Sequence, residues 1–331
     1  MTKNNYARLS AEAAALRLLE IKNPVILIHV KPDGDAVGSA AALSEIFRQL
    51  GESAKILSAD KIPARLEFIL ENTGTEVAES TVGCTAVSID VASPSQLGSL
   101  TESAPSPALM IDHHAIGEPL ADGYISPDAS SAAEALYDII LILESMGKIK
   151  LNKTLAFALY TAISSDTGCF AFSNASAKTH ICAAHLIELG IDTAYINNKL
   201  FYSKSKEQIT AEGFVASKIK TAQDGRIAYA TLTQGEREAL GVSPEHFETA
   251  IDVVRALRGA EIAFVVKEDK EGKMKVSLRS TGADVASVAK SFGGGGHIRA
   301  AGCSINEKTV EEAAELILLA LKKGQNSEKN N

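Results

Sequence analysis

Side chains that could bind a metal ion follow the first apolar stretch of the chain. Segment 24–43 reads PVILIHVKPDGDAVGSAAAL and places His29, Asp33 and Asp35 close together. Carboxylates with one imidazole form an oxygen and nitrogen donor set that suits Mn, Mg, Zn or Fe. On this segment alone, the aspartates could equally serve only to cap the helix that follows.

More aspartates and histidines stand where other predicted elements end. One aspartate follows the apolar run at 85–89, an aspartate and two histidines follow the run at 108–111, and another aspartate follows the helical pattern at 153–164. Two metal ions about 4 Å apart clamp a phosphate ester and activate a water molecule, which removes the need for a protein nucleophile. Such a site needs about six protein ligands, including a carboxylate that can bridge. The further candidates are Asp90, Asp112, His113, His114 and Asp166.

The elements that must position these residues alternate along the first part of the chain. Short apolar runs at 25–28, 55–57, 85–89 and 108–111 predict strands, and helical patterns at 7–20, 132–146 and 153–164 predict helices. This alternation favours an open α/β sheet, in which parallel strands end at one edge and ligands bind there. The scattered polar residues should therefore converge on one crevice.

The last third of the chain has a different pattern. After an all-helical stretch, strands are expected at 227–233, 261–269 and 273–280, with a short helix at 284–291, a glycine run at 293–296 and a final helix at 310–322. We therefore predict an α/β protein with two lobes, a doubly wound, mainly parallel sheet and a smaller mixed-sheet α/β domain, joined by a helical linker. The expected ranges are 1–190, 191–219 for the linker, 220–324, and a disordered tail at 325–331.

Composition narrows the class of protein. The chain has 331 residues, of which 46% are hydrophobic and 22% charged, as in soluble globular proteins. No apolar run reaches the roughly 18 residues that span a membrane, and the start lacks a signal-peptide core. The four cysteines form no CxxC pair, which predicts reduced thiols and a cytoplasmic protein.

Charge is unevenly distributed. Residues 203–331 contain 19 basic and 18 acidic side chains, whereas residues 1–202 contain 14 basic and 23 acidic ones. An acidic first lobe is a poor non-specific binder of long polyanions. It can hold cations, and these would reverse the local field for a phosphate. The balance favours a small or short phosphorylated substrate.

Together the motifs resemble those of the DHH phosphoesterase family. The matching features are HxxxDxD at 29–35, the strand-terminal Asp90, the DHH triplet at 112–114 and Asp166 in SSDTG. The segment GGGGHIRAAG at 293–302 is similar to the motif of the associated C-terminal domain in the branch of nanoRNases, pAp phosphatases and RecJ-type enzymes. The chain most resembles the group of bifunctional oligoribonucleases and 3′-phosphoadenosine-5′-phosphate (pAp) phosphatases.

The resemblance implies a role for each metal-site residue. His29, Asp33 and Asp90 would hold one ion, and Asp35, Asp90, His113 and Asp166 the second, usually as two Mn²⁺ ions, with Mg²⁺ as the other possibility. Asp112 would orient a histidine through its ring N–H, or else only cap the local chain. His114 would face the scissile phosphate and help protonate the leaving oxygen.

The resemblance also assigns substrate contacts to the second lobe. Arg279 and His297 would hold the non-scissile phosphate or base, beside Arg299 and the backbone amides of Gly294, Gly295 and Gly296. The glycine run could alternatively be only a tight turn. Two positions depart from the family pattern, because Gln96 and Ala171 stand where basic residues are common. Fewer basic contacts would affect substrate preference and leave the metal chemistry intact.

The expected activity follows from these implications. The protein would release 5′-mononucleotides from short RNA oligonucleotides and convert pAp to AMP, without a membrane partner and as a homodimer. One alternative is a phosphodiesterase for cyclic dinucleotides or linear pApA. An alternative of another class is a nucleotide-binding regulator that has lost catalysis.

Overall fold

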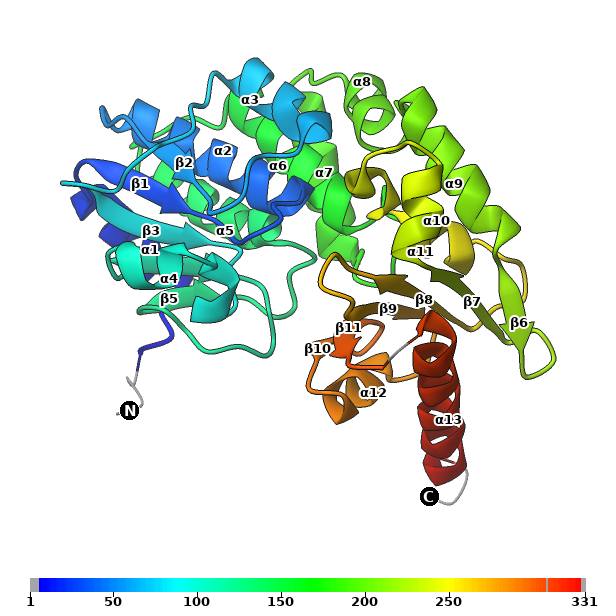
Figure 1. Cartoon of the computed structure of the whole chain (residues 1–331). Coiled ribbons are helices and arrows are strands. Elements are labelled where there is room, and N and C mark those ends of the chain that lie inside the picture. Colours follow the sequence, from blue (N-terminus) through cyan, green and yellow to red (C-terminus); the bar gives the residue numbers. More distant parts are fainter. Residues whose placement is uncertain (1–5, 308, 329–331) are drawn as a thin grey trace. The chain divides into compact units, whose positions relative to one another are not determined.

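The computed structural model describes residues 6–307 and 309–328 (Figure 1). It divides into two compact units, Met1–Ser203 and Lys204–Asn331. The boundary between the units lies inside the predicted helical linker at 191–219. Each unit contains its own sheet and its own hydrophobic core, so the predicted two-lobe α/β class is confirmed.

The first unit is built on a five-stranded parallel sheet with the order β2-β1-β3-β4-β5. The chain adds β2 on one side of β1 and then crosses to place β3 on the other. In such sheets the ligand crevice forms where the strand order reverses, here at the carboxyl ends of β1 and β3. The strands are β1 (Pro24–Leu27), β2 (Lys55–Leu57), β3 (Thr85–Ile89), β4 (Leu109–Asp112) and β5 (Gly123–Ile125).

Both faces of this sheet are covered. Alternate residues such as Ile26, Val87 and Ile111 pack against α1, α2, α3, α5 and α6, and the opposite face packs against the shorter η2 and α4. Burial on both faces explains the continuous apolar runs that predicted the strands. The helices of the unit are α1 (Ala11–Glu20), α2 (Gly34–Gln49), η1 (Ala64–Leu66), α3 (Glu67–Thr73), η2 (Pro94–Leu97), α4 (Leu100–Ser103), α5 (Ala132–Ser145), α6 (Lys153–Asp166), α7 (Ala177–Glu188), α8 (Thr193–Asn197) and the π-helix η3 (Asn198–Tyr202).

Two glycines allow helices α2 and α6 to approach closely. A Cβ atom added to Gly34 would lie 2.2 Å from Ser165 Oγ, and one added to Gly38 would lie 2.9 Å from the carbonyl oxygen of Ala158. No larger residue fits without moving a helix. The contact places the first turn of α2 against the last turn of α6. Asp35 and Asp166 are thereby brought to the same place from opposite helix ends.

The second unit is a six-stranded mixed sheet with the order β10-β11-β9-β8-β7-β6, in which only β7 and β8 pair in parallel. One face packs against α12 and α13, and the other against α9, η4 and α11. The elements are α9 (Lys206–Ser217), β6 (Lys220–Ala222), β7 (Ile227–Leu232), α10 (Gln234–Ala239), η4 (Pro244–Phe247), α11 (Ala250–Arg255), β8 (Ile262–Glu268), β9 (Met274–Ser280), α12 (Val285–Ser291), β10 (Gly295–His297), β11 (Ala300–Ile305) and α13 (Val310–Glu328).

Several details differ from the expectations. The glycine run does not stay a loop, because Gly295 and Gly296 pair with β11 as part of β10. Helix α9, placed in the predicted linker, packs Ala211 and Val215 into the core of the second unit. Helix α13 runs to Glu328, into the predicted tail at 325–331, and residues 329–331 lie outside the described part of the chain.

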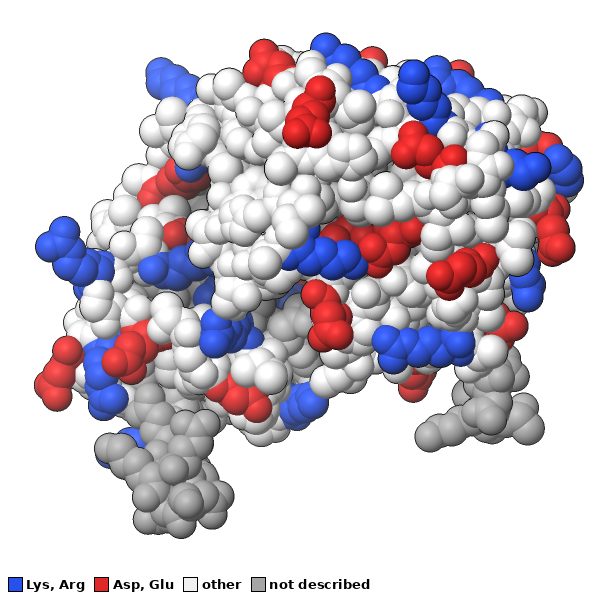
Figure 2. Space-filling view, turned by 180° about the vertical axis from the view of Figure 1, so that it is seen from behind, with Lys and Arg blue, Asp and Glu red and all other residues white. Residues whose placement is uncertain are grey.

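The described surface is mixed in charge. Figure 2 shows basic and acidic side chains interspersed, without a continuous basic band across the described residues on that face. None of the described helices combines the length and the apolar character needed to cross a membrane.

Candidate metal centre

Seven of the predicted residues lie at the carboxyl edge of the first sheet or at adjoining helix ends. Their ligand atoms form three groups in which all atoms lie within 4.8 Å of one another. Asp90 belongs to two of these groups and His113 to two. The groups are His29, Asp33, Asp90; Asp35, His113, Asp166; and Asp90, His113, His114.

His29 presents one defined ring nitrogen to the centre. Its Nδ1 lies 2.7 Å from the carbonyl oxygen of Val30, which fixes the proton on Nδ1. Its Nε2 lies 3.7 Å from Asp33 Oδ1 and 3.5 Å from Asp90 Oδ2. A backbone carbonyl behind the imidazole is the usual way to orient a metal-binding histidine.

Asp90 has the geometry of a bridging carboxylate. It follows β3 directly, is 3% exposed and adopts a left-handed backbone with φ of 58°. Oδ2 faces His29, whereas Oδ1 lies 3.6 Å from His113 Nε2. Oδ1 is buried and accepts no hydrogen bond from the described residues. Buried carboxylate oxygens are rarely left without a partner, so a cation at this place would supply the missing one.

Asp35 is held by the start of another helix. Its Oδ2 accepts a hydrogen bond of 2.7 Å from the amide of Ala132, and Oδ1 one of 3.2 Å from Ala133. These amides belong to the first turn of α5, where N–H groups lack partners within the helix. Asp35 Oδ2 lies 3.8 Å from His113 Nε2. Asp35 therefore links α2, to which it belongs, with the start of α5 and with His113 in the centre.

Asp166 is the last residue of α6 and completes the second group. Its Oδ2 lies 3.9 Å from His113 Nε2, and 31% of its side chain is exposed. Asp33 stands at the N-cap of α2, where Oδ1 accepts hydrogen bonds from the amides of Asp35 and Ala36. The capping role considered for this aspartate is thus present, beside its place in the first group.

Asp112 and His114 form a pair beside the centre. Asp112 ends β4 and is 1% exposed; its Oδ1 accepts a hydrogen bond from the amide of His113 and lies 2.8 Å from His114 Nδ1. The ring that Asp112 contacts at this distance is therefore that of His114. Burial by itself would lower the pKa of His114, but the bond to Asp112 and nearby carboxylates raise it to about 9.

The carboxylates of the centre lie so close together that their negative charges repel one another, and bound cations would relieve this repulsion. Burial first, and then the charge of Asp90 for Asp35 and of Asp33 for Asp166, raises the pKa of both carboxyls well above the ordinary value. Burial would lower the pKa of His29, yet Asp33 and Asp90 raise it to about 11. Divalent cations would offset the repulsion that these shifts reflect. The donor set of carboxylates and imidazoles without thiolates fits Mn²⁺ or Mg²⁺.

Gln96 has a structural role that its position in the sequence does not reveal. Its Oε1 accepts hydrogen bonds from the amides of Ala92 and Ser93, and its carbonyl oxygen accepts one from Val30. Gln96 therefore joins the loop after Asp90 to the loop that carries His29. The other departure, Ala171, is exposed in the loop after α6.

The residues predicted to bind substrate lie in the second unit. Gly294 and Gly296 are required for packing, because an added Cβ would lie 2.2 Å from the Gly302 carbonyl oxygen or 2.4 Å from that of Ala300. Gly295 differs, since a Cβ there would meet nothing. The hairpin tip exposes His297 and Arg299.

Arg279 lies on β9, opposite Ala300 in the neighbouring strand β11. Its side chain is partly buried and donates one hydrogen bond of 2.9 Å to the carbonyl oxygen of Leu278. Burial lowers the pKa of Arg279, while the charge of Asp252 acts in the opposite direction. A guanidinium held in this way remains a cation at neutral pH and can bind an anion bidentately.

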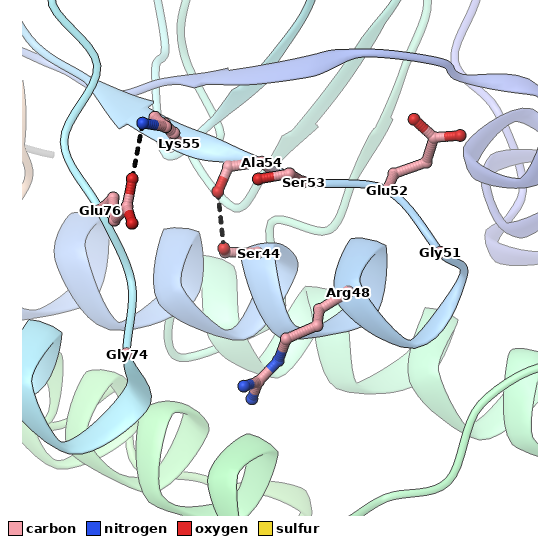
Figure 3. A pocket seen from close by; sticks show the side chains of 9 residues that line it. All are labelled: Ser44, Arg48, Gly51, Glu52, Ser53, Ala54, Lys55, Gly74 and Glu76. Atoms are coloured by element: carbon pink, nitrogen blue, oxygen red, sulfur yellow. Dashed lines mark hydrogen bonds and ion pairs between the residues drawn. The ribbon is translucent and has the colours of Figure 1, made fainter.

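An open pocket of about 370 Å³ lies away from the metal-site residues (Figure 3). It includes Lys55 at the amino end of β2, and therefore stands at the opposite edge of the sheet. Its charged groups pair within the protein, as between Lys55 and Glu76 at 2.6 Å, and Ser44 donates to the carbonyl oxygen of Ala54. These pairings leave it without an unbalanced charge for a phosphate.

Comparison with known proteins agrees with this arrangement. Residues 23–163 match the model of the DHH family N-terminal domain, and residues 224–323 match that of the DHHA1 domain. A solved structure of an exopolyphosphatase-related protein from Bacteroides fragilis aligns with a TM-score of 0.83 at 23% identity, over 95% of each chain. That likeness concerns the fold.

Two curated relatives align over most of their length. The bifunctional oligoribonuclease and PAP phosphatase NrnA of Bacillus subtilis is 28% identical, over 88% of this chain and 92% of the relative. The protein of the same name from Thermus thermophilus is also 28% identical, over 95% and 93% respectively. The two domains are matched in the same order as the two units, so the chain carries an N-terminal domain of the DHH family followed by a DHHA1 domain.

Proposed function

We propose that the protein is a metal-dependent phosphoesterase that hydrolyses short oligoribonucleotides to 5′-mononucleotides and converts pAp to AMP. The observation that carries the proposal is the position of Asp90, whose two oxygens face the imidazoles of two neighbouring ligand groups. A carboxylate shared in this way, with one oxygen lacking a hydrogen-bond partner among the described residues, is what a two-cation centre requires.

The proposed cofactor is a pair of divalent cations, Mn²⁺ or alternatively Mg²⁺. His29, Asp33 and Asp90 would hold one, and Asp35, Asp90, His113 and Asp166 the other. When bound, such ions activate water and neutralise phosphate charge. The fold prepares the ligands by orienting His29 through Val30 and by holding Asp35 on the amides of α5.

His114 and Asp112 would act on the phosphate itself. Against the effect of burial, the bond to Asp112 and the nearby carboxylates favour the protonated imidazole of His114, whose pKa is raised to about 9 in the metal-free protein. A protonated imidazole beside the ligands can stabilise negative charge on the phosphate and pass its proton to the leaving oxygen. Asp112 would keep the ring charged and oriented through the 2.8 Å contact between Oδ1 and Nδ1.

The choice of substrate is supported by the relatives, two of which are named for oligoribonuclease and PAP phosphatase activity. The acidic first unit is also a poor surface for long polyanions. We assign the non-scissile phosphate or base to Arg279 and His297, assisted by Arg299 and the amides of residues 294–296. A cytoplasmic location and a homodimer complete the proposal, the former supported by four free cysteines.

The test is release of mononucleotides, with Mn²⁺, from labelled RNAs of two to twenty-four nucleotides, with pAp and pApA in parallel. We expect activity that falls steeply with length, together with pAp turnover. Comparable rates at all lengths would indicate an open channel and an exonuclease. Preference for pApA or cyclic dinucleotides would indicate a dinucleotide phosphodiesterase, and absence of turnover with Mn²⁺ bound would indicate a regulator.

A further inference from the structure

Asn174 connects two segments that carry the second ligand group. It stands in the loop between α6 and α7, eight residues after Asp166. Its Nδ2 donates to the carbonyl oxygen of Ser130 at 2.9 Å and to that of Asp166 at 3.1 Å. An amide nitrogen has two hydrogens, so both bonds can form together. One side chain therefore ties the end of α6 to the residue before the N-cap of α5.

The first residues of α5, which Asn174 contacts through Ser130, also hold Asp35. The amides of Ala132 and Ala133, directly after the N-cap Ser131, donate to its carboxylate. Asp35 and Asp166 therefore lie at the two ends of one hydrogen-bonded path that passes through the first residues of α5 and Asn174. Both carboxylates approach the same atom, His113 Nε2, at 3.8 and 3.9 Å.

Glu134 fixes the middle of the path. Its Oε2 accepts hydrogen bonds from the amide and hydroxyl of Ser130, and from the hydroxyl of Thr179 in α7. These three residues are at most 1% exposed. Asn174 Oδ1 is also buried and accepts no hydrogen bond from the described residues. A polar cluster this deep in a core costs free energy, and in return it specifies one geometry.

The loop between Asp166 and Asn174 is strained. Gly168, Cys169 and Phe170 have φ values of 56°, 57° and 63°, a left-handed conformation that is unfavourable for the last two. Such strain persists only where surrounding contacts impose it. The two bonds of Asn174 anchor the loop at the backbone of Asp166, so losing them would let the loop relax and displace this ligand.

We propose that Asn174 is a positioning residue, which sets the spacing between Asp35 and Asp166 and thereby the affinity of the cation that these residues share with His113. The inference rests on the proposed metal centre. Asn174 itself need not touch the cation or the substrate, because its effect passes through the backbone of Asp166 and the start of α5.

The experiment measures Mn²⁺ binding to the full chain by calorimetry, together with kcat and thermal stability, for Asn174→Ala and a matched control. Asn72→Ala is the control, because Asn72 Nδ2 also donates to a backbone carbonyl, that of Phe68, and to Tyr195, away from the centre. For Asn174→Ala we expect one Mn²⁺ to bind about 10- to 100-fold more weakly, with kcat partly restored by excess Mn²⁺. Asn72→Ala should keep wild-type Mn²⁺ affinity.

Equal Mn²⁺ affinity in Asn174→Ala and the wild type would overturn the inference, whatever the loss of stability. If that variant does not fold, Asn174→Gln carries the test, since it keeps the amide but displaces it, and it should bind one Mn²⁺ more weakly than the wild type; wild-type affinity in Asn174→Gln would overturn the inference. A wild-type protein that binds no Mn²⁺ would overturn the inference and the metal centre together. A wild type that binds Mn²⁺ but turns over no substrate contradicts only the proposed function.

Discussion

The carboxyl edge of the first sheet and the β10–β11 hairpin of the second both gather residues predicted to contact metal or substrate, but they do so in different ways. At the sheet edge, ligands from positions 29 to 166 are brought within a few ångströms by parallel strands and helix ends. On the hairpin, residues 295–299 follow one another in the sequence, and His297 and Arg299 are exposed. The first arrangement depends on the whole fold, the second on one turn.

The two regions also differ in electrostatics. The sheet edge concentrates like charges in a buried place, as the raised pKa of Asp35 and of Asp166 shows. The hairpin consists of neutral backbone with a few basic side chains beside it. Gly294 and Gly296 are needed there because a Cβ atom would collide with β11. Changes at the edge should therefore affect chemistry and cation binding, whereas changes at the hairpin should affect substrate affinity or folding.

The largest effect is expected from Asp90→Asn. Asparagine tolerates the left-handed backbone at this position, so the change removes charge without adding strain. Because both proposed cation sites lose the negative charge that they share, we expect turnover to fall by about 1000-fold or more. Asp224→Asn is the control, since Asp224 is also left-handed, with φ of 55°, but lies in the second unit. A variant Asp90→Asn that keeps more than a tenth of wild-type turnover would refute the bridging role.

Arg279→Ala should show that the second region affects substrate binding without affecting the reaction or cation binding at the first. Loss of a charge-assisted, bidentate contact should raise KM for pAp by about 10- to 100-fold, while kcat and Mn²⁺ affinity stay close to wild type. Arg279→Lys should recover only part of the loss, because an ammonium cannot bind bidentately. The exposed Arg226, at the start of β7, provides the control substitution to alanine. A fall in kcat with constant KM would instead place Arg279 among the residues that act on the reaction itself.

The sheet edge could be predicted from the sequence because each proposed ligand stands at or near the end of an element. His29, Asp90 and His113 follow strands, whereas Asp33 and Asp35 stand at the start of α2 and Asp166 at the end of α6. Lys55–Leu57 and Thr85–Ile89 coincide with β2 and β3, and the parallel arrangement brings their ends together. The hairpin was only partly predictable. Glycine and alanine have low strand propensity, so β11 forms because β9 offers an edge to pair with, and β10 forms because it pairs with β11 in turn. The three-residue β5 is too short to give a pattern.

Contacts between distant segments were also beyond prediction. The bonds from Ala132 to Asp35 span 97 residues and depend on how α2 and α5 pack. The hydrogen bond from the amide of Ala92 to Gln96 depends on the conformation of a loop, which the sequence does not reveal. The sequence itself shows only that Gln96 stands where the family pattern has a basic residue. Sequence therefore identifies the residue types at the centre, whereas tertiary packing decides which partner orients each of them.

The glycine run allows packing and ligand approach to be separated. Gly296→Ala would place a Cβ 2.4 Å from the Ala300 carbonyl oxygen in a residue with φ of 134°, and should cost about 1–3 kcal/mol. The Tm of the second unit should then fall by about 4–12 °C. Gly295→Ala should leave Tm unchanged, because its Cβ meets nothing. If Gly295→Ala nevertheless raises KM, the substrate occupies the open space beside Gly295. If KM does not change, the glycines are needed only for packing.

The stabilisation of the first unit by Mn²⁺ is the effect that tests the electrostatic contrast itself. At 100 times its Kd a cation stabilises the folded state by about 2.7 kcal/mol, which corresponds to about 5–10 °C in Tm for a unit of this size. Asp90→Asn should lose most of this shift, whereas Arg279→Ala should retain it.

The shift in Tm should also shrink when the pH is lowered from 7.5 to 5.5. In the metal-free folded protein the pKa values of Asp35 and Asp166 are raised, so these carboxyls retain protons that unfolded carboxyls have lost. Their contribution to stability is present at low pH and is lost as the pH rises toward the raised pKa values. Lower pH therefore relieves repulsion without a cation and makes protons compete with Mn²⁺ for the same oxygens. Calorimetric scans in EDTA and in Mn²⁺ at both pH values measure the difference, and a shift that is equal or larger at pH 5.5 would mean that crowding of these carboxylates does not drive cation binding.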